Sequence, residues 1–102
     1  MAARQPKLPD GPPKVLLGKI PRFPEELIGV VSEGSVRLEF TIGRAGKAHT
    51  IKVLESTHEL FESLATHTID TATFSPAIKD GKPFAARIRQ TVLFEAPQLK
   101  GE

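Results

Sequence analysis

A strict alternation of apolar and polar residues between positions 36 and 42 places the strongest constraint on the fold of this chain. The apolar side chains recur at every second position, at Val36, Leu38, Phe40 and Ile42. Because successive side chains of a strand point to opposite faces, this pattern predicts a strand with one face in the core. Residues 43–46, Gly-Arg-Ala-Gly, predict a hairpin turn, and residues 48–55 predict the returning strand, with Ile51 and Val53 directed inward.

Two helices are predicted around this hairpin. The first starts at Pro24, because proline suits the first helical position and the two glutamates that follow suit the positive end of the helix dipole. It spans about two turns and ends at Gly34. The second is capped by Ser56 or Thr57 and cannot continue through Pro76. Its apolar stripe consists of Leu60, Phe61, Leu64, Ala65, Ile69 and Ala72.

A last long strand is predicted over residues 84–94, after a turn at residues 80–83. Its inward residues are Ala86, Ile88, Val92 and Phe94. If the second helix returns this strand beside residues 36–42, the fold class is α+β, with a three-stranded antiparallel sheet of order 2-1-3 and both helices on one face. Phe40 and Phe61 then face each other across the layer. The last strand is an edge, and its unpaired N–H and C=O groups can pair with another strand.

Charge and composition divide the chain into three segments: a proline-rich basic arm (1–20), a folded domain (21–96) and a short tail (97–102). Residues 1–24 carry five basic groups and one acidic group, a net +4, whereas residues 25–102 carry nine basic and eleven acidic groups, a net −2. The folded part therefore lacks the clustered basic residues of a nucleic-acid-binding domain. The first residues have no signal-peptide core, and we expect targeting and anchoring segments to lie outside this chain.

The residue types that carry catalysis or metal binding do not form a site. The chain has no cysteine, and His58 and His67 lie about 180° apart on the predicted helix, so they cannot share a metal ion. The acidic residues Glu55, Glu59 and Glu62 suit a solvated helix start. No serine lies in a nucleophile motif. We therefore expect a protein that is not an enzyme and that has no cofactor and no metal.

Several short motifs follow one another along the chain: Pro21, Phe23 and Pro24; Glu33 and Gly34; Gly46; Ser56; Phe74 and Pro76; Asp80, Gly81 and Pro83. No single motif is specific, but the ordered set over residues 21–94 resembles the C-terminal domain of TonB energy transducers. In that family a Pro-x-aromatic-Pro segment precedes a short helix, Glu-Gly opens the first strand, and an aromatic residue followed by proline ends the second helix.

The resemblance implies a periplasmic adaptor domain, anchored in the inner membrane, that binds outer-membrane transporters. Its last strand, residues 87–94, would pair with the TonB box, an extended N-terminal segment of those transporters, and residues 21–24 would lie close to the partner. Energy would come from an ExbB–ExbD motor through an N-terminal helix. The implied partner-binding residues are Pro21, Arg22, Phe23, Pro24, Arg87, Arg89, Gln90, Thr91, Val92, Leu93 and Phe94.

Two alternatives stay open at this point. The segment 21–24 is either a stiff entry that packs Phe23 on the sheet or an arm that offers Arg22 to a partner. The domain is either a transducer or an envelope scaffold of TolA or TonB-like type, which would use its edge strand for self-association or another protein partner without transport. The chain also departs from the family at Thr71 and Thr73, where many members carry basic residues.

Overall fold

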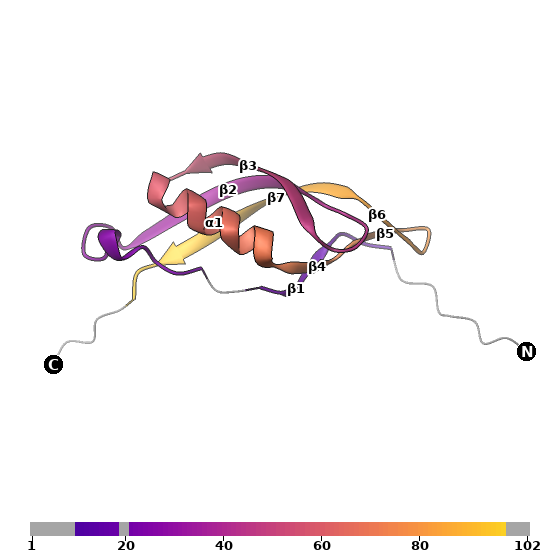
Figure 1. The fold of residues 1–102 in the computed structure, drawn as a ribbon, viewed down its shortest axis with the longest axis horizontal. Helices are drawn as coiled ribbons and strands as arrows, with labels where there is room; N and C mark the ends of the chain where they lie inside the picture. Colours follow the sequence, from indigo (N-terminus) through magenta and orange to yellow (C-terminus); the bar gives the residue numbers. More distant parts are fainter. Residues whose placement is uncertain (1–9, 19–20, 98–102) are drawn as a thin grey trace, which may run out of the picture.

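The computed structural model describes residues 10–18 and 21–97. The rest of the predicted arm and tail, residues 1–9, 19–20 and 98–102, lies outside the described residues. The elements are β1 (Lys14–Leu17), η1 (Glu25–Leu27), β2 (Glu33–Ile42), β3 (Ala48–Ser56), α1 (Glu59–Thr71), β4 (Thr73–Ser75), β5 (Ala77–Lys79), β6 (Lys82–Phe84) and β7 (Ala86–Glu95). In Figure 1, α1 lies across the three long strands.

The main sheet is antiparallel and has the order β3-β2-β7. The strand with the strict alternation, β2, is therefore central, between its hairpin partner and the last strand. These are the strand neighbours that the sequence predicts, so the α+β class and the three-stranded sheet are confirmed. The two predicted helices are not: the described residues contain one α-helix, α1.

The predicted first helix is a single 3-10 turn, η1. Only two backbone bonds define it, from the Leu27 N–H to the Pro24 carbonyl and from the Ile28 N–H to the Glu25 carbonyl. Gly29 then adopts a φ of +84° and reverses the chain, and β-branched residues follow, which favour extended structure over helix. Of the apolar residues that follow Pro24 in this segment, only Leu27 is buried. Gly34, the predicted helix end, lies inside β2.

The core lies between α1 and the inner face of the sheet. The four alternating residues of β2 (Val36, Leu38, Phe40 and Ile42) are fully buried, as is Phe61 of α1. Phe40 and Phe61 do not pair with each other as predicted, because each ring packs against other aromatic rings. Phe61 lies between Phe23 (ring centroids 5.4 Å apart) and Phe94 (4.7 Å), and Phe40 contacts Phe74 at 5.7 Å.

Helix α1 begins one or two residues later than predicted, because β3 continues through Ser56. The N-cap is His58, whose Nδ1 accepts a hydrogen bond from the Leu60 N–H at 3.1 Å. The Ser56 hydroxyl donates instead to the carboxylate of Glu62 in the first turn of α1. The apolar stripe is otherwise as predicted, with Phe61, Ala65 and Ile69 facing the sheet.

The predicted last strand corresponds to β7, Ala86–Glu95, and part of the predicted turn before it is a further short strand. Residues Lys82–Phe84 form β6, which pairs with β5, and β7 begins at Ala86. The turn between β5 and β6 has positive φ at both central residues, Asp80 (+54°) and Gly81 (+75°), as a two-residue hairpin of type I′ requires. No helix in the described part of the chain is long and apolar enough to span a membrane.

Part of the predicted arm is paired with the domain. Residues Lys14–Leu17 form β1, antiparallel to β4. Further along, Gly11 and Ile78 exchange two backbone hydrogen bonds, of 3.1 and 3.0 Å. The Asp10 carboxylate also accepts a bond from the Gly81 N–H at 3.2 Å. Main-chain pairing therefore holds residues 10–17 along β4 and the β5–β6 hairpin.

Candidate functional site: the free edge of β7

The main sheet has two edge strands, β3 and β7, and only β7 is regular. Its register with β2 runs through ten residue pairs without a shift. The register of β3 shifts twice, and Thr50 in β3 has a φ of +53°. Bulges twist an edge and disrupt the row of donors and acceptors that another strand would need. Among the described residues, β7 is therefore the edge suited to strand pairing.

The hydrogen-bond pattern shows which residues of β7 direct their main-chain N–H and C=O groups toward β2. Just beyond the paired segment, the Ala96 N–H donates to the Ser32 carbonyl at 2.9 Å. In an antiparallel ladder, directly opposed residues alternate between bonded and non-bonded pairs. Counting along the unshifted register from Ala96 and Ser32 makes Gln90 and Leu38 a bonded pair. The N–H of Gln90 therefore points into the sheet.

The hydrogen bonds on the β3 side of β2 lead to the same assignment. The carbonyl of Ser35 accepts from the Thr57 N–H at 3.0 Å on the β3 side, so odd-numbered residues of β2 pair with β3 and even-numbered residues pair with β7. Successive main-chain groups of a strand point to opposite sides. The residues whose N–H and C=O groups point to the free edge are therefore Arg87, Arg89, Thr91, Leu93 and Glu95.

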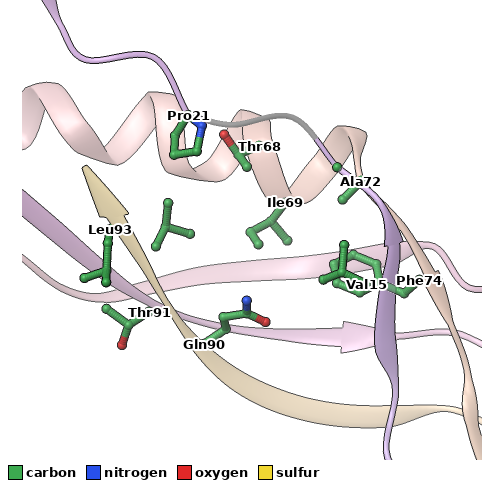
Figure 2. A pocket seen from close by; sticks show the side chains of 11 residues that line it. Val15, Pro21, Thr68, Ile69, Ala72, Phe74, Gln90, Thr91 and Leu93 are labelled. Carbon is green, nitrogen blue, oxygen red and sulfur yellow. The ribbon is translucent and has the colours of Figure 1, made fainter. Parts of the chain in front are cut away.

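A groove of about 370 Å³ runs beside the C-terminal half of this edge. One wall is β7, the floor is the end of α1 with Phe74, and the other wall is formed by Val15 of β1 with Gly18 and Pro21. Figure 2 shows Gln90 in the space between β7 and β1, with Ile69 of α1 nearby. The lining residues are Val15, Gly18, Pro21, Thr68, Ile69, Ala72, Phe74, Gln90, Thr91, Val92 and Leu93.

Gln90 interrupts the apolar pattern of β7 at this groove. In the side-chain alternation of β7, Gln90 stands at an inner-face position, between Ile88 and the buried Val92. The residue is nevertheless exposed. A polar residue at an inward position was visible in the sequence as a break in the alternation. The far wall of the groove was not, because its position depends on where β1 pairs.

The predicted partner-binding residues separate into two groups. Pro21 lines the groove and Arg22 is exposed, but Phe23 and Pro24 are buried. The ring of Phe23 packs edge-on against Phe61, which supports the stiff-entry reading of this segment. On β7, Val92 and Phe94 are buried, and their main-chain groups pair with β2.

The outer face of the sheet carries an ion-pair cluster next to the free edge. Glu39 of β2 accepts from Arg87 Nε at 2.9 Å and from Arg89 Nε at 3.1 Å. Arg87 also donates to the carbonyl of Thr50, at 3.1 Å, and so links β7 to the irregular part of β3. The hydrogen bonds from Arg89 and then Arg87 lower the pKa of Glu39 below its ordinary value of 4.5.

This lowered pKa predicts an acid-sensitive contribution to stability. A carboxyl group whose pKa is lower in the folded state stabilises the fold above its unfolded pKa, and the contribution is lost as the pH falls through the folded value. We expect Glu39→Gln to lower the melting temperature at pH 7, and the difference from the wild type to shrink as the pH falls below the ordinary pKa of 4.5 and the wild-type carboxylate becomes neutral. Thermal melts of the wild type and the variant at pH 7 and pH 3 measure this difference at each pH.

Glu55→Gln is the matched control on the same face. Glu55 pairs with Arg37 at 3.3 Å, but both side chains are largely exposed, and such pairs contribute little. A pH-independent difference between the wild type and Glu39→Gln would contradict the assignment of this cluster.

Within the described ranges, no three histidine, cysteine or acidic side chains are grouped to hold a metal ion. The fold and its edges thus define a small α+β domain with one covered sheet face and one regular, open edge strand. The model of the family described as Gram-negative bacterial TonB protein C-terminal matches residues 19–96. The chain belongs to this family of TonB C-terminal domains.

Two solved structures agree with this assignment. The solution NMR structure of the Pseudomonas aeruginosa TonB C-terminal domain is 29% identical, with a TM-score of 0.64 over 93% of this chain and 95% of that one. A TonB2 protein structure from Vibrio anguillarum is 27% identical, with a TM-score of 0.60 over 96% and 98% of the two chains. No curated protein sequence matches the chain.

Proposed function

We propose that this chain is the periplasmic adaptor domain of a TonB-type energy transducer, and that it binds the TonB box of outer-membrane transporters by strand addition to β7. Domains of this family generally interact with outer-membrane transporters and belong to Gram-negative envelope proteins. The role is binding rather than catalysis, with ExbB–ExbD as the source of energy and no cofactor required.

The observation that carries this proposal is the regular free edge of β7. Arg87, Arg89, Thr91 and Leu93 direct their main-chain groups away from β2. In strand addition, main-chain hydrogen bonds supply affinity and pockets for alternate side chains supply specificity. The groove beside residues 90–93 lies where one face of an added strand would rest.

The side chains of Arg87 and Arg89 have a smaller part in this proposal. Both are engaged by Glu39, although the side chain of Arg89 is 61% exposed. A screened surface charge affects the rate and salt dependence of association more than it affects affinity. Arg89→Ala should therefore weaken binding only mildly and reduce its salt dependence.

Amide hydrogen exchange during titration with a TonB-box peptide tests the proposal. We expect the amides of Arg87, Arg89, Thr91 and Leu93 to become protected, because their N–H groups acquire partners. The amide of Gln90 should change little, since it is already bonded to β2. A peptide of the same composition in scrambled order is the control.

The same experiment separates the competing function. Protection of the odd-numbered β7 amides that grows with protein concentration, without peptide, would instead favour the self-associating scaffold. Protection confined to β3, or no protection at all, would contradict strand addition to β7.

A further inference from the structure

The far wall of the groove is held in place mainly by its main chain. We refer to residues 10–18 as the strap. All four residues of β1 have exposed side chains, so the strap buries little apolar surface of its own. Its described contacts are mostly main-chain ones: the β1–β4 pairing, the two Gly11–Ile78 bonds, and the bonds of the Ser75 hydroxyl with the Lys14 N–H (3.1 Å) and carbonyl (3.4 Å). The Asp10 carboxylate adds the bond from the Gly81 N–H at 3.2 Å. Segments with few buried apolar contacts open at low free-energy cost.

The strap faces β7 across the groove. Val15 and Gly18 line one side, and Gln90 with Leu93 lines the other. Val15 is 50% exposed and Leu93 is 69% exposed, although both are aliphatic. A strand on the free edge of β7 would lie about 4.8 Å from it, on the side of β7 that borders the groove.

The alternation of an added strand determines what its side chains meet. A partner residue opposite Gln90 would point to the same face of the sheet as Gln90, which is the groove side. There it would contact Val15 and Ile69. The residues before and after it would point to the outer face, beside Arg89 and Thr91. The groove lining therefore fits an aliphatic side chain at that one position of the partner.

Resting on the proposed function, we propose that the strap is part of the peptide-binding site: it is the second wall against which one aliphatic side chain of the added strand packs. Peptide binding and strap docking then stabilise each other, because the peptide buries the exposed side of Val15. This coupling is reciprocal, so undocking of the strap weakens peptide binding by the same factor by which the bound peptide stabilises the docked strap.

Substitution of two adjacent residues of β1 tests the proposal. Val15 lines the groove, whereas Leu16, which stands at the register shift between Val15 and Leu17, does not. We expect Val15→Asp to weaken the binding of a TonB-box peptide about tenfold, because it places a charge against the aliphatic side chain. Leu16→Asp, the matched control, adds the same charge at a residue that is 65% exposed and should change the affinity less than about twofold.

A second measurement keeps the test independent of any effect of Val15→Asp on strap docking. In the unmodified protein, saturating TonB-box peptide should slow amide exchange in the strap, at Lys14–Leu17, as well as on β7. A peptide in which the aliphatic residue facing the groove is replaced by lysine should lose the strap protection and about tenfold in affinity.

The outcomes distinguish this inference from the proposed function. If the peptide protects β7 but not the strap, and Val15→Asp binds like Leu16→Asp, the strap proposal is overturned while strand addition stands. If the unmodified protein binds no peptide, both are overturned. A tenfold loss in Val15→Asp, together with strap protection, supports both.

Discussion

Thr91→Pro should abolish TonB-box binding while the domain stays folded. Proline has no N–H, so the substitution removes a donor that points to the free edge, and its ring projects into the space of an incoming strand. We expect a loss of affinity of about 100-fold or more, from the missing bond and the steric conflict together. Titration of the variant with a TonB-box peptide, after a thermal melt that shows it folded, measures the effect.

Two further variants make this prediction specific. Gln90→Pro removes the N–H that pairs with Leu38 inside the sheet, so it should unfold the domain rather than spare it. Thr91→Val keeps the N–H and the shape of the side chain, so it should bind normally. Wild-type affinity in a folded Thr91→Pro variant would exclude main-chain pairing at this edge.

Gly34→Ala should destabilise the domain about as much as a large core truncation does. A Cβ on Gly34 would overlap the ring of Phe61. That ring is fully buried between Phe23 and Phe94, so it cannot move aside. Overpacking of a core usually costs about 1–3 kcal/mol, and we expect the upper end of that range or beyond. Urea denaturation of the purified variant gives the free energy of unfolding.

The interaction between Gly34 and Phe61 can be isolated with a double-mutant cycle. Phe61→Ala alone should cost roughly 3–5 kcal/mol because it leaves a cavity. Gly34→Ala combined with Phe61→Ala should cost less than the sum of the two single changes, because the smaller side chain vacates the space that the new methyl group needs. Strictly additive costs would show that the two residues do not conflict.

Gly11→Ala is the matched control. No heavy atom outside the adjoining residues lies within 4 Å of a Cβ at that position, so the melting temperature should hardly change. A destabilisation equal to that of Gly34→Ala would mean that glycine itself, rather than the Phe61 contact, is what these positions require.

Part of the fold that creates the free edge could be predicted from the local sequence. Local sequence showed the central strand, because burial of one face leaves a period of two in the side chains, from Val36 to Ile42. It also showed the stripe of α1 and a turn at Asp80 and Gly81, although the other two residues of that predicted turn belong to β6. These features depend on residues close together in the chain, so their pattern can be read without knowing the tertiary neighbours.

The first helix was mispredicted because the apolar residues that recur at helical spacing do not share one buried face. Leu27 faces the core, but Ile28 and Val31 are 38% and 36% exposed, and Gly29 reverses the chain. Gly34 was interpreted as a helix end, although its place in β2 is set by Phe61, which lies 27 positions later in the sequence. A steric requirement between distant residues leaves no local pattern.

The sequence by itself determined that this is a small α+β domain with an edge strand near its C-terminus. Only the tertiary structure decided which N–H groups point outward, since the choice between Gln90 and Thr91 depends on the register between β7 and β2. It also decided that Val15 of the arm forms a wall of the groove. The physical reason is that main-chain pairing is nearly independent of side-chain identity, so the hydrogen bonds that dock β1 and orient β7 leave little trace in the sequence.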